Sequence, residues 1–325
     1  MSTPRRTPTA LLVVAVAALL AALPAAGADP SGWQRAELWG ADVRSLVFHP
    51  DDPDRVWAGT SGGQLYVSRD GGGSWADAGA PMALRGWVVS DLEVDPDDPG
   101  RLWAALWGTQ GGGLVVASDD GGASWEVPGR GLYHTKVYTV ARVPGRPGHL
   151  YAGTLSGVYF SADGGVTWRH LTTQLPEVHK VTSLLVGPLD PDRVFAGTWE
   201  RAWRSDDGGA TWYGVFDGMI LDSEVFTLTP VPGWPDEIWA STCGWVYRTL
   251  DAGGRWQRFR DGFENRRTPA FAALPGGRLL AGTVGGLHLS DDGGANWRRV
   301  GPAGLSVLSL AYHPRRSRRD RKSVV

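Results

Sequence analysis

Short apolar runs alternate with polar turns along most of this 325-residue chain, and they recur in a fixed order. In the first copy, a run at 43–48 is followed by one at 56–60 that ends in a small-residue turn, and then by a third at 65–67. Trp75 opens a fourth run. Short β-branched and aromatic runs separated by Gly, Pro and Asp are typical of antiparallel strands. The pattern therefore predicts units of four strands, which we call a, b, c and d.

An eight-residue motif, Ser/Thr-x-Asp-x-Gly-x-x-Trp, joins run c to run d in six copies, and we call it the box. Successive box aspartates are 50, 43, 44, 44 and 41 residues apart, which is a period typical of stacked or radial repeats. Four strands at this period predict an all-β protein, a β-propeller of four-stranded antiparallel blades. The box Asp and Trp residues are Asp70 and Trp75, Asp120 and Trp125, Asp163 and Trp168, Asp207 and Trp212, Asp251 and Trp256, and Asp292 and Trp297.

The residue types in the box suit a tight hairpin turn between strands c and d. An Asp side chain accepts hydrogen bonds from backbone N–H groups two or three residues on, and Gly supplies a positive φ. The Trp buries a large face against the blade. A calcium loop is the alternative for Asp120, Asp207 and Asp292, each of which follows another Asp, but two carboxylates fall short of a six-oxygen cage. We therefore interpret the six box aspartates as structural and expect no metal and no cofactor.

The motif resembles the Asp-box, or BNR repeat, over residues 33–314. Asp-box propellers occur in sialidases, sortilin-type receptors, xyloglucanase-type glycoside hydrolases and the photosystem II assembly-factor family. The resemblance therefore implies the propeller fold, but the families that share the box include both enzymes and binding proteins.

The N-terminal residues 1–28 have the pattern of a secretory signal. Arg5 and Arg6 precede an apolar run at 11–23, and Ala26-Gly27-Ala28 offers a cleavage site. The run is too short to span a bilayer, so we expect no stable membrane insertion after cleavage, with a retained anchor as the alternative. These features predict a secreted or periplasmic bacterial protein. The expected domains are the signal at 1–28, the propeller at 29–314 and a basic disordered or truncated tail at 315–325.

Charge limits the classes of partner, and the cysteine count limits the disulfides that the chain can form. Residues 29–314 carry 24 basic and 33 acidic residues, a net charge of −9, which disfavours nucleic acid and anionic membranes. The single cysteine, Cys243, cannot form an internal disulfide, and we expect it to be a buried structural thiol. No phosphate-binding loop or cluster of metal ligands is evident.

The two ends of the repeat region carry unpaired pieces of a blade. The segment 33–36 resembles a strand d, and 307–312 resembles a strand a followed by His313-Pro314. We therefore expect seven blades with an incomplete seventh, in which the terminal strands meet and remove exposed edges. The alternative is a ring of six blades with two additional strands.

The d–a and b–c loops of a propeller share one face, opposite the boxes, and we call it the loop face. We expect binding there, through Trp and Arg residues of the kind that anchor interfaces and through lysines at the channel mouth. The candidate binding residues are Trp87, Trp107, Lys136, Lys180, Trp199 and Arg201. Inside the channel, either Ser90 and Tyr138 or Asp91 and Thr139 face inward, and the alternation of the strand leaves both choices open.

These features favour a monomeric, non-catalytic binding or scaffold protein that recognises a polypeptide or envelope partner through the loop face. The resemblance to assembly-factor and sortilin-type propellers implies the same role, although this chain lacks the cysteine-rich module of sortilin. A carbohydrate is the other class of ligand.

A secreted glycoside hydrolase, sialidase-like or xyloglucanase-like, is the alternative function. It requires two carboxyl groups that flank the scissile bond, and the candidates are Asp42, Asp91, Asp222 and Glu224. Sialidase-type catalysis also requires three arginines and a tyrosine nucleophile, and their spacing here matches no sialidase pattern. Activity as an enzyme is therefore the less favoured prediction.

Overall fold

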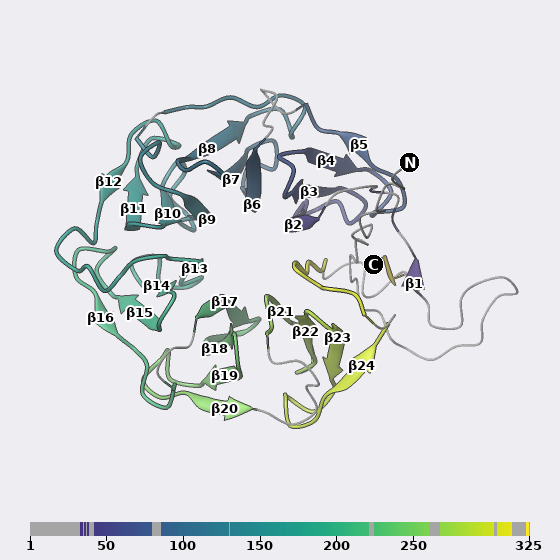
Figure 1. Ribbon diagram of the computed structural model, residues 1–325, viewed down its shortest axis with the longest axis vertical. Helices are drawn as coiled ribbons and strands as arrows, with labels where there is room; N and C mark the ends of the chain where they lie inside the picture. Colours follow the sequence, from purple (N-terminus) through teal and green to yellow (C-terminus); the bar gives the residue numbers. More distant parts are fainter. Residues whose placement is uncertain are drawn as a thin grey trace, which may run out of the picture.

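A computed structural model of the chain describes residues 33–34, 36, 38, 42–79, 86–129, 131–220, 224–259, 267–301, 304–313 and 323–324. The signal at 1–28, Asp222 and nearly all of the basic tail lie outside these residues. The described strands form a ring of six blades around a central channel, with strand a of each blade innermost (Figure 1). The predicted all-β propeller is confirmed, with the blade count of the six-blade alternative.

The first three blades follow the predicted order a, b, c, d with antiparallel neighbours. Their strands are β2 (Val43–Phe48), β3 (Val56–Thr60), β4 (Leu65–Ser68) and β5 (Ala76–Asp77); β6 (Trp87–Val94), β7 (Leu102–Gly108) and β8 (Gly113–Ser118); and β9 (Val137–Arg142), β10 (Leu150–Thr154), β11 (Gly157–Ser161) and β12 (Arg169–His170).

The last three blades repeat the same order. Their strands are β13 (Ser183–Val186), β14 (Val194–Gly197), β15 (Ala202–Ser205) and β16 (Tyr213–Gly214); β17 (Val225–Val231), β18 (Trp234–Thr242), β19 (Val246–Thr249) and β20 (Gln257–Phe259); and β21 (Ala270–Ala273), β22 (Leu279–Thr283), β23 (Gly286–Ser290) and β24 (Arg298–Val300).

The second blade has three strands and a single bridge in place of its fourth. Glu126 exchanges both backbone hydrogen bonds with Ala117, at 2.8 and 2.9 Å. The next bonded position along this edge falls at Pro128, which has no N–H to donate. The ladder therefore stops after one residue pair.

The hydrophobic core lies between consecutive blades. Strand b is buried along its whole length in blade one, and its Trp57 packs into the same cluster as Val89 and Leu92 of blade two. The residue three positions after a box Trp also packs against the next blade. Val215 of blade four packs with blade five, and Phe259 of blade five packs with blade six. Each blade is thus stabilised by burying apolar surface against the next one.

Four side-chain hydrogen bonds connect consecutive blades at one recurring place. Each donor comes from strand b or c, and each acceptor is the carbonyl oxygen of the residue after a box Asp in the next blade. We call these the interblade hydrogen bonds. They run from Trp57 Nε1 to Gly121 (3.1 Å), Trp103 Nε1 to Gly164 (3.2 Å), the Tyr151 hydroxyl to Gly208 (3.0 Å) and an Arg204 guanidinium N–H to Ala252 (2.9 Å).

The boxes form the c–d turns, as predicted. In the second box, Asp120 Oδ1 accepts from the backbone N–H of Ser124 at 2.9 Å, and Oδ2 accepts from the Ser124 hydroxyl at 2.6 Å. Ser118 Oγ in turn accepts from the Gly122 N–H at 2.9 Å. The Ala123 N–H also donates to Asp120 Oδ1 at 2.9 Å, so the expected contact three residues on is accompanied by one four residues on. These hydrogen bonds hold the pKa of Asp120 at about 2.

The segment 304–313 lies between blade six and blade one, where a seventh blade would place strand a (Figure 1). The Val307 N–H donates to Thr283 O at 2.9 Å, as Val225 N–H does to Thr198 O in an ordinary junction. His313 Nε2 lies 2.9 Å from Pro50 O in blade one. The expected seventh blade is wrong as a sheet, because 304–313 forms no strand and pairs with no strand b among the described residues.

The two ends of the chain meet in a parallel pair of β1 (Trp33–Gln34) and β25 (Ser323–Val324), and not through the expected strand at 307–312, which forms no strand. Ala36 and Leu38 are buried against Val43 and Phe48 of blade one. The described part of the chain contains no helix with the length and apolar character needed to cross a membrane.

Candidate functional site

Lys180 is the centre of the best-formed polar cluster on the loop face. Its Nζ lies over the ring of Trp199 and 4.0 Å from Glu224 Oε1. Burial lowers the pKa of Lys180, Glu224 raises it in part, and Arg267 adds to the lowering. The lysine reaches this position with a φ of 48°, a left-handed backbone that is uncommon outside glycine. Such conformations collect at binding and active sites, because the surrounding structure must hold them in place.

The predicted binding residues Lys136 and Trp107 form a second pair at the same mouth. Lys136 Nζ lies 4.5 Å from the centroid of the Trp107 ring, and Tyr138 packs edge-on against that ring. Burial raises the pKa of Tyr138, and the negative charge of Glu224 raises it further, which places the two clusters within electrostatic reach. The structure thus brings together four of the six predicted residues.

The other two predicted residues have other packing partners. Arg201 stacks over Phe216 at 4.3 Å, on the d–a loop of blade four. Trp87 is half-buried and packs into the core cluster between blades one and two, so its role is mainly structural. Arg258 over Trp245 and Arg267 over Phe226 repeat the arrangement of a cation above an aromatic ring. Sequence reasoning missed both pairs, because the two members of each pair lie in different elements, with Arg258 on β20 and Phe226 on β17.

Irregularities in strand a decide which of its residues face the channel. In blades one, two, three and five the register between strands a and b shifts by one residue. The strand a residues left without an opposite partner on strand b are Arg44, Ser90, Tyr138 and Phe226. Such a bulge places two consecutive residues opposite one. Both candidate sets therefore line the channel, which has a volume of about 270 Å³.

Two carboxyl groups on strand β6 have raised pKa values in or beside this channel. Burial raises the pKa of Asp91 to about 6, although the Thr139 hydroxyl (2.6 Å) and the Val140 N–H (3.1 Å) donate to it. Burial, and then the charge of Asp91, raise the pKa of Glu93 to about 8, against the opposing effect of Arg142 at 3.6 Å. Sequence reasoning missed Glu93, although its spacing of two from Asp91 places it on the same side of the strand.

The other hydrolase candidates have separate partners. Asp42 pairs with Arg44 at 3.4 Å and Glu224 with Lys180, and Asp222 lies outside the described residues. Among the residues that the structure describes, no three His, Cys, Asp or Glu side chains are grouped to hold a metal ion.

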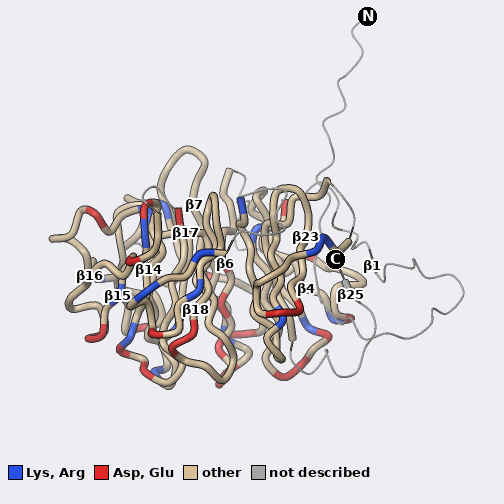
Figure 2. Tube along the Cα trace, turned by 90° about the horizontal axis from the view of Figure 1, so that it is seen from below, with Lys and Arg blue, Asp and Glu red and all other residues tan. Residues whose placement is uncertain are grey.

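Two further surface features are the exposure of Cys243 and the uneven distribution of acidic residues between the two faces. Cys243 is exposed, contrary to our expectation of a buried thiol, because strand b ends at Thr242 and the cysteine starts the b–c turn. Acidic residues gather toward one face of the disc, the lower side in Figure 2. The boxes and a–b loops, which are rich in Asp, share one face, so the loop face is the less acidic of the two.

No protein-family model matches the chain, and no curated protein matches it either. Solved structures do match. A glycoside hydrolase family 74 xyloglucanase from Xanthomonas campestris is 20% identical with a TM-score of 0.66, and the match covers 80% of this chain but only 45% of the enzyme. YCF48 from Cyanidioschyzon merolae is 18% identical with a TM-score of 0.58, over 81% of this chain and 87% of that one.

A structure of YCF48 bound to a D1 peptide is 17% identical with a TM-score of 0.60, over 90% and 86% of the two chains. At these identities the likeness is one of fold, which hydrolases and assembly factors share. The chain is therefore similar to β-propellers of both kinds, and it spans less than half the length of the xyloglucanase.

Proposed function

We propose that this protein is a non-catalytic binding propeller that recognises a polypeptide through its loop face, outside the cytoplasm. The observation that carries the proposal is the pair of clusters at the channel mouth, Lys180 with Trp199 and Lys136 with Trp107. Each lysine is held over an aromatic ring, so that its charge is placed before a ligand arrives. Preorganised side chains lose less entropy on binding, and Trp and Arg recur as the anchors of interfaces.

The chemistry of these clusters favours a peptide that carries carboxylates. Arg201, Arg258 and Arg267 add three further cations over rings on the same face. Of the nearby carboxylates, Glu224 is already paired with Lys180. An acidic segment can therefore gain charge-assisted contacts at the mouth, while its apolar side chains lie on the exposed edge of Trp199, which is 45% exposed. The peptide-bound YCF48 structure shows that a propeller of this fold binds a peptide.

Binding of defined peptides tests the proposal. A fluorescent peptide of alternating Glu and Leu residues is titrated against the wild type, a Lys136→Ala/Lys180→Ala variant and an Arg69→Ala/Arg255→Ala variant. Arg69 and Arg255 are exposed in boxes on the opposite face, so this control removes the same charge. We expect the lysine variant to bind at least tenfold more weakly and the control within twofold of wild type. Equal losses in the two variants would indicate a general charge effect and contradict the proposed site.

A hydrolase remains the alternative, supported by the raised pKa values of Asp91 and Glu93. Its test is release of reducing sugar from xyloglucan and of aglycone from sialyl and other aryl glycosides. Turnover that disappears in Asp91→Asn and Glu93→Gln variants would replace the binding proposal with a glycosidase.

A further inference from the structure

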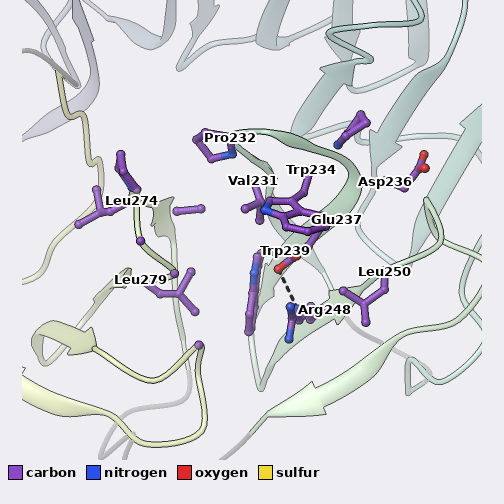
Figure 3. Close-up of a pocket in the computed structure, with 16 residues that line it drawn as sticks. Val231, Pro232, Trp234, Asp236, Glu237, Trp239, Arg248, Leu250, Leu274 and Leu279 are labelled. Atoms are coloured by element: carbon purple, nitrogen blue, oxygen red, sulfur yellow. Dashed lines mark hydrogen bonds and ion pairs between the residues drawn. The ribbon is translucent and has the colours of Figure 1, made fainter.

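A groove of about 750 Å³ lies between blades five and six, on the box face and thus opposite the proposed peptide site (Figure 3). Trp234 and Pro232 overhang it from the a–b hairpin of blade five. Trp239 lies between Leu279 on one side and Arg248 on the other. A volume of this size is in the ordinary range for small-molecule or side-chain binding sites.

The groove exists because the a–b loop of blade six is short. The a–b loops of the first four blades are closed by a backbone hydrogen bond across seven residues, as between His49 and Arg55. In blade six the same bond joins Leu274 and Arg278, across five residues. Blade five meanwhile extends its hairpin, with β18 starting at Trp234 directly after the turn. A long hairpin thus stands beside a loop that is two residues short, and the space between them stays open.

The interblade hydrogen bond is also missing at this junction. Trp239 holds the position of Trp57 on strand b, and Gly293 holds the position of Gly121 after the box Asp. Trp239 Nε1 is buried and has no hydrogen-bond partner in the described structure. Arg248, the neighbour that corresponds to Arg204, pairs with Glu237 at 2.8 Å instead of reaching the next blade. A buried donor without an acceptor destabilises the fold, because it has lost the hydrogen bond that water would give it.

The lining of the groove favours an uncharged, apolar ligand. Trp234 and Leu250 are 67% and 63% exposed, which is high for large apolar side chains, and both line this groove. Both lining carboxylates are already in ion pairs, Glu237 with Arg248 and Asp236 with Arg193, each at 2.8 Å. A sugar would need free polar side chains for its hydroxyl groups, and these pairs leave few.

We propose that this groove binds an extended, proline-rich segment of another polypeptide. Polyproline II helices have no internal hydrogen bonds, so their carbonyl oxygens are free acceptors, and they lose little entropy on binding to aromatic grooves. Trp234 offers a flat ring for stacking of prolines, and Leu250 extends the apolar surface. A peptide carbonyl at the floor supplies the acceptor that Trp239 lacks. The segment carries no net charge where it contacts the groove.

The test uses a labelled, capped decaproline peptide and fluorescence anisotropy with the full chain. We expect saturable binding that weakens at least tenfold in Trp234→Ala, whose side chain is 67% exposed. Trp199→Ala, on the loop face, is the matched control and should bind like wild type. A Gly-Ser decapeptide should not bind.

A second variant addresses the cause of the groove. Replacement of Leu274–Arg278 by the seven-residue sequence of His49–Arg55 fills the space, and it should abolish decaproline binding without changing the acidic-peptide binding of the loop face. The proposal is overturned if decaproline does not bind at millimolar concentration or binds Trp234→Ala as tightly as wild type. It is also overturned if a labelled cello-oligosaccharide binds wild type but not Trp234→Ala, and unlabelled decaproline does not displace it.

Discussion

The indole Nε1 of Trp57 donates to the carbonyl oxygen of Gly121, 3.1 Å away in the next blade and 64 residues later in the chain. The acceptor belongs to a box turn, so the box of one blade orients the core aromatic residue of the blade before it. Each such box thus has two structural roles: it forms the turn of its own hairpin, and it supplies a hydrogen-bond acceptor to the blade before it. Three similar bonds connect the blades that follow.

Trp57→Phe and Trp239→Phe are expected to change the free energy of unfolding by different amounts, although both remove an indole N–H from strand b. Both substitutions remove the same buried ring volume and leave a cavity. The first also breaks an interblade hydrogen bond, whereas the second removes a buried donor without a partner, so the first should lower the free energy of unfolding by about 1 kcal/mol more than the second. Urea unfolding monitored by circular dichroism measures both. Equal destabilisation would show that loss of ring volume, and not the hydrogen bond, dominates at this position.

The box aspartates should make the protein sensitive to acid. Hydrogen bonds depress the pKa values of Asp120 and Asp207 to about 2, from an ordinary value of 3.8. A carboxylate with a depressed pKa contributes stability that is complete above its unfolded pKa and is lost as the pH falls toward its folded pKa. The urea concentration at the midpoint of unfolding should therefore decrease as the pH is lowered from about 5 to about 2. Asp120→Ala should lower stability by about 1 kcal/mol at pH 7 and show a shallower decline in that range.

Glu93 is expected to have the opposite dependence on pH. Its pKa is raised from 4.5 to about 8, so the folded state holds a proton that the unfolded chain has released. Stability should then decrease as the pH rises from about 4.5 to 8. Glu93→Gln mimics the protonated side chain, so it should match wild type at pH 4.5 and exceed it at pH 8.5. A variant that is less stable than wild type at pH 8.5 would show that the charged pair with Arg142 governs this site.

The sequence predicted the repeat well because local chemistry determines it. The box contains its own turn, and Gly122 takes the positive φ, 82°, that the turn requires. Lys136, Trp107, Lys180 and Trp199 were placed at the mouth from their positions before strand a and after strand b. Their pairing could not be predicted, because it depends on side-chain directions across different blades. The channel lining was undecided for a related reason: a bulge overrides the alternation of a strand.

The groove between blades five and six is a feature that the sequence analysis missed. Its signal was a two-residue deficit between Leu274 and Arg278, which is visible only when the a–b loops are aligned by their closing hydrogen bonds. The exposed cysteine was missed because strand b ends one residue before it. Both errors concern the ends of strands, where backbone pairing stops and composition carries little information.

The segment 304–313 should be the least protected part of the described ring. It lies in the position of a strand a, yet it forms no strand there, and its ordered contacts include the Val307 N–H to Thr283 and the packing of Ala311 and Tyr312. Amides outside a complete ladder exchange through small local openings. Hydrogen exchange should therefore be at least tenfold faster at 308–312 than in the corresponding strand β21, with the Val307 amide intermediate. Equal protection in the two segments would mean that 304–313 is paired as firmly as a blade, and the propeller would then be closed by a seventh sector rather than by packing alone.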